Sequence, residues 1–153
     1  MQHTKFKIDW IIYDQIALGP LPKREKDIKL LKENNIKSVL SLCEIEKYLP
    51  KDFLSKDFNH KEIVLPDHEY GKFPLHKEIE ECLEALKVLT KIGPTYIHCY
   101  ASMERSPLIC MAWIIRVHNL KPQEALDYVM QNHKGTSPLP EQLALLKKVY
   151  DCT

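Results

Sequence analysis

The sequence lacks the features that mark a membrane protein or a nucleic-acid-binding protein. Its longest apolar run, PLICMAWII at 107–115, is too short to cross a bilayer and ends at Arg116. Lys and Arg together number 22 against 21 Asp and Glu, so there is no basic excess of the kind that binds nucleic acid. The first ten residues lack the apolar core of a signal peptide. We therefore expect a soluble cytoplasmic protein with neither nucleic acid nor membrane as a partner.

Paired cysteines are also missing. The five cysteines, at positions 43, 82, 99, 110 and 152, are an odd number at irregular spacings, and no CxxC pair occurs. This pattern argues against a disulfide framework or a zinc ribbon. We expect reduced thiols, most of them serving as small apolar core residues, and neither a metal nor another cofactor.

Internal repeats, low-complexity tracts and evident linkers are absent from the chain. A length of 153 residues is enough for one domain with an ordinary hydrophobic core. We expect residues 1–153 to form a single domain that acts as a monomer.

Short apolar runs alternate with amphipathic segments along the chain. Strands are predicted within 9–22 (two short ones around Asp14), at 36–43, at 60–66 and at 95–99. Helices are predicted at 23–35, 75–92, 107–119, 121–133 and 140–150, and short helical turns within 44–59. Strands that alternate with helices predict an α/β fold in which helices flank a central, mainly parallel sheet of about 4–5 strands.

The stretch YIHCYASMERSP, residues 96–107, carries the main functional signal. Cys99 falls where a predicted strand ends and a turn leads into a helix, and Arg105 follows six positions later. Ligands of open α/β sheets bind beyond the carboxyl ends of the strands, and loop amides with a helix N-terminus bind anions there. The same positive field favours the thiolate of Cys99, and the planar guanidinium of Arg105 can hold two phosphoryl oxygens. The stretch therefore predicts a nucleophilic cysteine beneath a bound phosphate.

A proton donor is also needed, because an alkoxide or phenoxide leaves poorly from phosphorus. Asp67, in VLPDHEYGKFP, opens a polar loop just after a predicted strand, and that strand would end at the same sheet edge as Cys99. A Pro–Asp pair is also common in turns, so Asp67 taken alone is better explained as a turn residue or helix cap. Beside Cys99 and Arg105 we favour the general acid.

The order strand, His98-Cys99, five residues, Arg105-Ser106, helix, with Asp67 thirty-two residues upstream of Cys99, resembles the cysteine-dependent dual-specificity protein phosphatases. The resemblance spans nearly the whole chain and implies the protein tyrosine phosphatase-like fold. It implies that Cys99 becomes phosphocysteine and that Arg105 binds the phosphoryl group and its transition state. Asp67 would act first as general acid and then as base for the attacking water.

The resemblance also implies roles for the neighbours of Cys99 and Arg105. Ser106 would stabilise the departing thiolate, and His98 would favour the Cys99 thiolate and order the loop. No metal is implied. The backbone amides that would complete the phosphate cradle belong to Tyr100, Ala101, Ser102, Met103, Glu104 and Arg105.

Two loop residues depart from the family's pattern. Many members have glycine three residues after the cysteine, where this chain has Ser102. If that position needs a backbone that suits glycine, serine costs about 1–2 kcal/mol of strain. Serine could instead fit there without strain and add a hydroxyl near the phosphate. Glu104 puts an acid directly before the arginine, and YASME contains no Lys or Arg, unlike members that act on inositol lipids or RNA ends. The loop sequence therefore counts against polyanionic substrates.

We predict a phosphatase that hydrolyses phosphotyrosine in proteins or peptides through a phosphocysteine intermediate, with phosphoserine and phosphothreonine as further candidates. Two alternatives remain open. The same chemistry could act on a non-protein phosphate ester, such as a phosphoinositide or a nucleotide. The chain could instead be a phosphate-binding module that turns over weakly because of Ser102 and Glu104.

Overall fold

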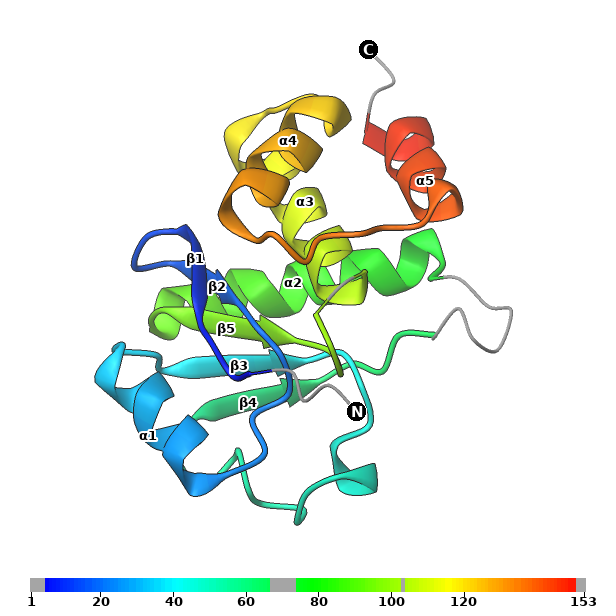
Figure 1. The fold of residues 1–153 in the computed structure, drawn as a ribbon. Coiled ribbons are helices and arrows are strands. Elements are labelled where there is room, and N and C mark those ends of the chain that lie inside the picture. Colours follow the sequence, from blue (N-terminus) through cyan, green and yellow to red (C-terminus); the bar gives the residue numbers. More distant parts are fainter. Residues whose placement is uncertain (1–4, 67–73, 103, 151–153) are drawn as a thin grey trace.

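A five-stranded sheet lies between helices on both of its faces (Figure 1). The computed structural model describes residues 5–66, 74–102 and 104–150. The strands are β1 (Asp9–Ile12), β2 (Ile16–Leu18), β3 (Ser38–Ser41), β4 (Asn59–Glu62) and β5 (Thr95–His98). The helices are α1 (Glu25–Glu33), the 3₁₀ helix η1 (Ile45–Lys47), α2 (His76–Ile92), α3 (Arg105–His118), α4 (Pro122–Asn132) and α5 (Pro140–Tyr150). None of the helices in these described ranges is long and apolar enough to cross a membrane.

The strands follow the order β1-β2-β5-β3-β4, and every neighbouring pair is parallel except the β1–β2 hairpin. The predicted α/β fold with a mainly parallel sheet is therefore confirmed. In the register of the central pair, Ser41 at the end of β3 lies opposite His98 at the end of β5. The carboxyl ends of these two strands thus lie side by side, directly before the loop that begins at Cys99.

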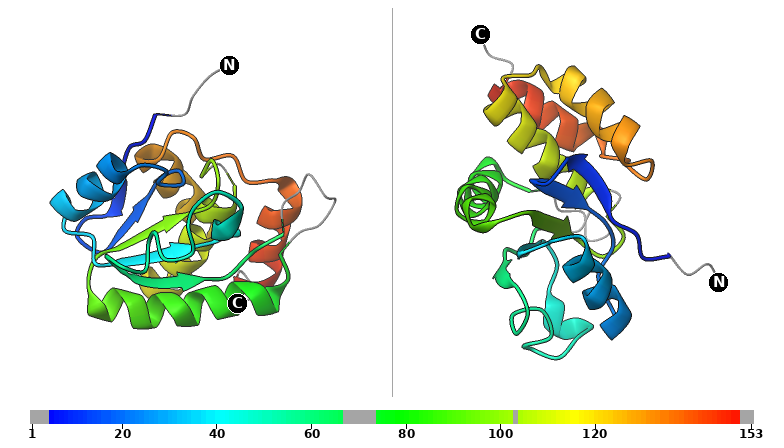
Figure 2. Two further views of the ribbon diagram at one scale, coloured as in Figure 1. Left: turned by 90° about the horizontal axis from the view of Figure 1, so that it is seen from below. Right: turned by 90° about the vertical axis from the view of Figure 1, so that its left-hand side faces the viewer.

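Both faces of the sheet are buried, and they pack against different helices. Figure 2 shows α1 and the segment around η1 on one face and α2 to α5 on the other. Along β3, Val39 belongs to the cluster with α1 and Leu40 to the cluster with α2 and α3; Tyr96 and Ile97 divide in the same way along β5. This alternation on two covered faces explains why two adjacent residues at the centre of each strand are large, hydrophobic and buried.

The strand predicted at 60–66 is shorter in the structure, where β4 ends at Glu62. The chain nevertheless follows β3 further, because the amides of Ile63 and Leu65 donate to the carbonyls of Ser41 and Leu42 at 2.9 and 3.0 Å. The chain is therefore tied to the sheet edge up to two residues before Asp67. Asp67 itself belongs to the segment 67–73, which lies outside the described residues.

Four helices begin with a side chain at their third position that accepts a hydrogen bond from the backbone N–H before the helix. These side chains belong to Asp27 in α1, Glu78 in α2, Glu124 in α4 and Gln142 in α5. The first turn of α3 contains no acidic residue and begins at Arg105. Because the amides of a first helical turn carry a partial positive charge, the N-terminus of α3 is suited to an anion.

Candidate active site

Cys99 follows the last residue of β5 at the carboxyl edge of the sheet, where ligands of parallel sheets bind. Its side chain is buried, and the backbone N–H of Ser102 donates to Sγ at 3.2 Å. The first residue of the loop, Tyr100, is tied down because its carbonyl accepts the N–H of Leu21 at 3.1 Å. The strand-to-helix turn predicted around Cys99 is therefore present, and it directs at least one backbone donor at the sulfur.

The other described cysteines differ from Cys99 in their surroundings. Burial raises the pKa of Cys43 and that of Cys82 to about 12, and it raises the pKa of Cys110 as well. All three are free thiols in the core and stay protonated at neutral pH. The structure thus supports the prediction that most cysteines are small apolar core residues, while Cys152 lies outside the described residues.

Arg105 opens α3, and its side chain is almost fully buried. Its Nη1 lies 3.5 Å from the carbonyl oxygens of both Leu42 and Leu65. Leu42 follows β3, and Leu65 lies two residues before Asp67, so two segments at the sheet edge position the guanidinium beside the loop. The predicted role of Asp67 as general acid falls outside the described residues and stays a prediction.

His98 is fully buried and orders the start of the loop through neutral hydrogen bonds. Burial lowers the pKa of His98 to about 4, and it lowers the pKa of His60 too. The neutral ring donates from Nδ1 to the Cys99 carbonyl at 2.9 Å and accepts the Ser41 hydroxyl at Nε2 at 2.6 Å. Ser41 Oγ in turn accepts from His60 Nε2 at 2.8 Å. The ordering role predicted for His98 fits this chain of bonds, but a role as a positive charge does not.

Ser102 adopts the conformation that the family's glycine would suit. Its φ of 61° lies in the left-handed region, so the strain anticipated from the sequence is present. Its hydroxyl and that of Ser106 are buried and have no hydrogen-bond partner within the described part of the chain. Two buried hydroxyls beside the loop are suited to a phosphate oxygen or a thiolate, and the role of Ser106 towards the thiolate stays a prediction.

The remaining cradle residues are only partly described. Glu104 is the N-cap of α3, and its carbonyl accepts the N–H of Leu108 at 3.0 Å. Ala101 is half-buried, Tyr100 is exposed, and Met103 lies outside the described residues. The helix predicted at 107–119 thus begins two residues earlier, at Arg105, and follows the loop directly, while the cradle role of each amide stays a prediction.

The rim of the loop contains a cation that the sequence analysis missed. Lys23 Nζ donates to the Tyr100 hydroxyl at 3.1 Å and lies 4.7 Å from the centroid of the same ring. The ring of Tyr48 lies on Tyr100 with centroids 5.0 Å apart. Lys23 is 77 positions from Tyr100, so no local pattern connects the two residues. The structure thus adds a positive charge beside a loop whose only charged residue before Arg105 is Glu104.

Known proteins resemble this chain over most of its length, including the loop from Cys99 to Arg105. Residues 19–152 match the model of the dual specificity phosphatase catalytic domain. The chain is 27% identical to phosphatidylglycerophosphatase and protein-tyrosine phosphatase 1 of Rattus norvegicus, over 93% of this chain and 77% of that protein. A crystal structure of PTPMT1 in complex with PI(5)P has a TM-score of 0.79 at 21% identity and covers 94% of both chains. The active form of Tk-PTP has a TM-score of 0.81 at 20% identity and covers 95% of this chain and 97% of its own.

Proposed function

The chain belongs to the dual specificity phosphatase family, and we propose that it hydrolyses the phosphate monoester of a glycerolipid headgroup through a phosphocysteine intermediate. The rat relative is named for activity on phosphatidylglycerophosphate as well as phosphotyrosine, and PTPMT1 has been crystallised with a phosphoinositide. The phosphotyrosine substrate predicted from the sequence is the second candidate. The two candidates share one chemistry and differ in what surrounds the phosphate.

The proposed reaction has two displacements at phosphorus. The Cys99 thiolate attacks in line and forms the S–P bond, while the P–O bond to the alcohol breaks and Asp67 gives its proton to the leaving oxygen. Water, deprotonated by Asp67, then attacks phosphorus, and inorganic phosphate and the thiolate are released. Arg105 and the loop amides bind the equatorial oxygens, where charge must be stabilised in both steps.

The position of Lys23 beside Tyr100 is the observation that favours a lipid over a phosphotyrosine substrate. Phosphatidylglycerophosphate carries a phosphodiester beside its terminal monoester, so it brings a second negative charge to the rim of the loop. Lys23 Nζ, 3.1 Å from the Tyr100 hydroxyl, offers a cation within reach of the loop at an exposed position. The loop sequence alone argues against polyanionic substrates, and this distant lysine weakens that argument. A lipid substrate also brings the protein to a membrane surface, contrary to the expectation from composition, whereas a cytoplasmic location stays a prediction.

Replacing Lys23 tests the lipid proposal. Lys23→Gln should lower kcat/KM on phosphatidylglycerophosphate in mixed micelles by roughly 3–10-fold, the worth of one exposed charge-assisted contact. Hydrolysis of p-nitrophenyl phosphate, which has no second phosphate, should stay within about twofold. Lys91→Gln is the matched control. Lys91 is exposed in the last turn of α2, at the end of the sheet opposite to the loop, so its replacement should alter neither rate. A wild-type enzyme that prefers phosphotyrosine peptides to the lipid would overturn the proposal and support the protein substrate.

Replacing Asp67 tests its role as general acid. Asp67→Asn should slow hydrolysis of an alkyl phosphate by roughly 10²–10⁴-fold, the usual contribution of a general acid. It should slow p-nitrophenyl phosphate much less, because p-nitrophenolate leaves without a proton. Steady-state rates on the two substrates at one pH make the comparison. Equal losses on both would remove Asp67 from this role.

A further inference from the structure

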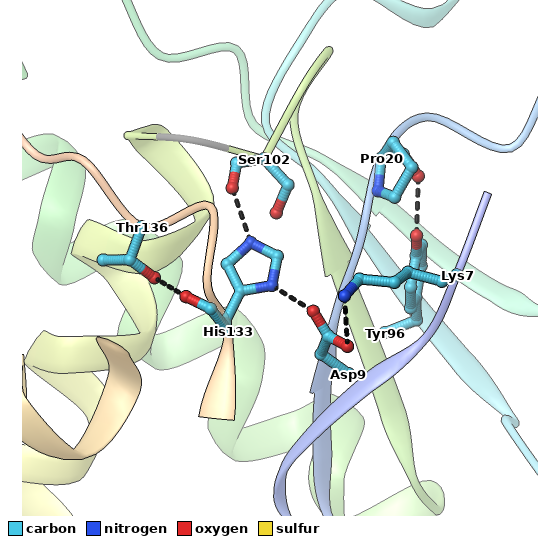
Figure 3. Close-up of polar contacts among 7 residues, drawn as sticks. All are labelled: Lys7, Asp9, Pro20, Tyr96, Ser102, His133 and Thr136. Atoms are coloured by element: carbon cyan, nitrogen blue, oxygen red, sulfur yellow. Dashed lines mark hydrogen bonds and ion pairs between the residues drawn. The ribbon is translucent and has the colours of Figure 1, made fainter. Parts of the chain in front are cut away.

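His133 connects the phosphate loop to the N-terminal strand (Figure 3). Its Nε2 lies 2.7 Å from the Ser102 carbonyl oxygen, and its Nδ1 lies 2.6 Å from Oδ2 of Asp9. The ring is buried, with 5% of the residue exposed. Asp9 begins β1 and His133 follows α4, so this contact joins three segments that are far apart in the sequence.

The backbone of His133 is anchored on its own. Its N–H donates to the Val129 carbonyl at 2.8 Å and thereby ends α4. Its carbonyl accepts both the amide and the hydroxyl of Thr136, at 3.1 and 2.7 Å. Because both sides of its peptide backbone are fixed, the ring is held at a defined distance from the loop rather than following it.

Both ring nitrogens of His133 face oxygen atoms that only accept. A carbonyl and an ionised carboxylate have no proton to give, so both contacts are hydrogen bonds at the same time only when the ring carries a proton on Nδ1 and on Nε2. A neutral ring would leave one of the two contacts with lone pairs facing each other. Lys7 also contacts this cluster, because its Nζ lies 3.5 Å from Oδ1 of Asp9. His133 and Asp9 thus form a largely buried ion pair that ends on the Ser102 carbonyl.

Ser102 is held at both of its backbone polar groups. Its N–H donates to Cys99 Sγ, and its carbonyl accepts from His133. Its left-handed φ of 61° is disfavoured for serine, and the hydrogen bond between His133 and the Ser102 carbonyl in this conformation offsets the strain. The same bond keeps a partially negative oxygen turned to His133, where it cannot repel a bound phosphate.

We propose that His133 is a positioning residue for the phosphate loop. Paired with Asp9, it holds the Ser102 carbonyl, keeps Ser102 in the left-handed conformation and so keeps the Ser102 amide on the Cys99 sulfur. It acts through Ser102 and has no contact with the substrate. This role rests on the phosphatase chemistry proposed above, and it is independent of whether the substrate is a lipid or a protein.

The first experiment compares His133→Gln with His118→Gln, the same change at an exposed histidine at the end of α3. His133→Gln should lower kcat/KM on p-nitrophenyl phosphate by roughly 10–100-fold, the cost of a loop misplaced by a fraction of an ångström. It should weaken inhibition by vanadate, a phosphate analogue, by a similar factor, while His118→Gln changes neither. Thermal melting shows how much enzyme is folded. A lower melting temperature with an unchanged inhibition constant would mean a merely structural role and would overturn the proposal.

The second experiment addresses the ion pair. Asp9→Asn keeps the shape of the side chain but replaces the charged acceptor of His133 Nδ1 by a neutral amide. It should lower kcat/KM on p-nitrophenyl phosphate and weaken inhibition by vanadate, as His133→Gln does but by a smaller factor. Unchanged values of both would overturn the role of the ion pair.

The third experiment tests whether His133 acts through Ser102. Glycine adopts a positive φ without penalty, so His133→Gln should cost less in a Ser102→Gly background than in the wild type. An equal or larger loss would overturn this route. If the wild type shows no turnover at all, the proposed function fails, but the loop can still be tested. Inorganic phosphate should then protect Cys99 from iodoacetate less well in His133→Gln than in His118→Gln, and equal protection would overturn the positioning role.

Discussion

Cys99→Ser is expected to lower hydrolysis of p-nitrophenyl phosphate by about 10⁴-fold or more, because a serine hydroxyl stays protonated at neutral pH and is a much weaker nucleophile than a thiolate. The substitution exchanges one buried atom, and the Ser102 amide can still donate to the new oxygen. The fold and the phosphate cradle should therefore survive. Initial rates in excess chelator, with thermal melting of both proteins, provide the measurement.

Cys82→Ser is the matched control for this change. Cys82 is equally buried, but it lies on α2 and its raised pKa keeps it protonated, so the folded variant should retain its turnover number. Mass spectrometry after rapid acid quench should detect phosphocysteine in the wild type and not in Cys99→Ser. Activity that survives in Cys99→Ser would remove Cys99 as the nucleophile. Absence of turnover in the wild type would leave the weakly active phosphate-binding module as the best explanation.

Arg105→Lys is expected to lower kcat by roughly 10²–10³-fold although the positive charge is kept. An ammonium group is a point charge and cannot offer two parallel donors to two phosphoryl oxygens. In the wild type, Nη1 of Arg105 lies 3.5 Å from the carbonyl oxygens of Leu42 and Leu65. The lysine side chain is shorter and cannot reach both carbonyls in the same way. Inhibition by vanadate should weaken as well, because the loss concerns binding of the tetrahedral group.

Arg116→Lys is the control for Arg105→Lys. Arg116, at an exposed position of α3, pairs with Glu80 of α2. A solvent-exposed ion pair contributes little, so Arg116→Lys should leave the rate within about twofold. The two variants at the loop are then distinguished by binding: Cys99→Ser keeps affinity for phosphate, whereas Arg105→Lys loses affinity and rate together. An Arg105→Lys enzyme with near wild-type turnover would contradict the forked contact.

Some features of the site could be predicted because they are local in the sequence. The turn from Cys99 to Arg105 lies between one strand and one helix, and the periodicity of these two elements is enough to place both residues at the carboxyl edge of the sheet. The same stretch raised the question of strain at Ser102, and the φ of 61° in the structure answered it. The α/β class was predictable for a related reason, because the order of strands and helices along the chain is itself a sequence property.

Other features depended on burial, which the sequence does not fix. A histidine next to a nucleophilic cysteine suggests a positive charge, yet the buried His98 has a pKa of about 4 and acts through neutral hydrogen bonds. The loop sequence also suggested a rim without cations. Lys23 changes that picture because Leu21 and Tyr100, which are joined by a backbone hydrogen bond, bring the segment after β2 to the loop.

The sequence by itself determined the fold class and the loop with its cysteine and arginine. Only the tertiary structure decided that Lys23 lies at the rim and that Asp9, His133 and Ser102 meet behind the loop. The physical reason is the range of the contacts. Periodicity specifies what neighbours along the chain do, whereas contacts between β1, the end of α4 and the loop depend on the strand order β1-β2-β5-β3-β4, which no local pattern encodes.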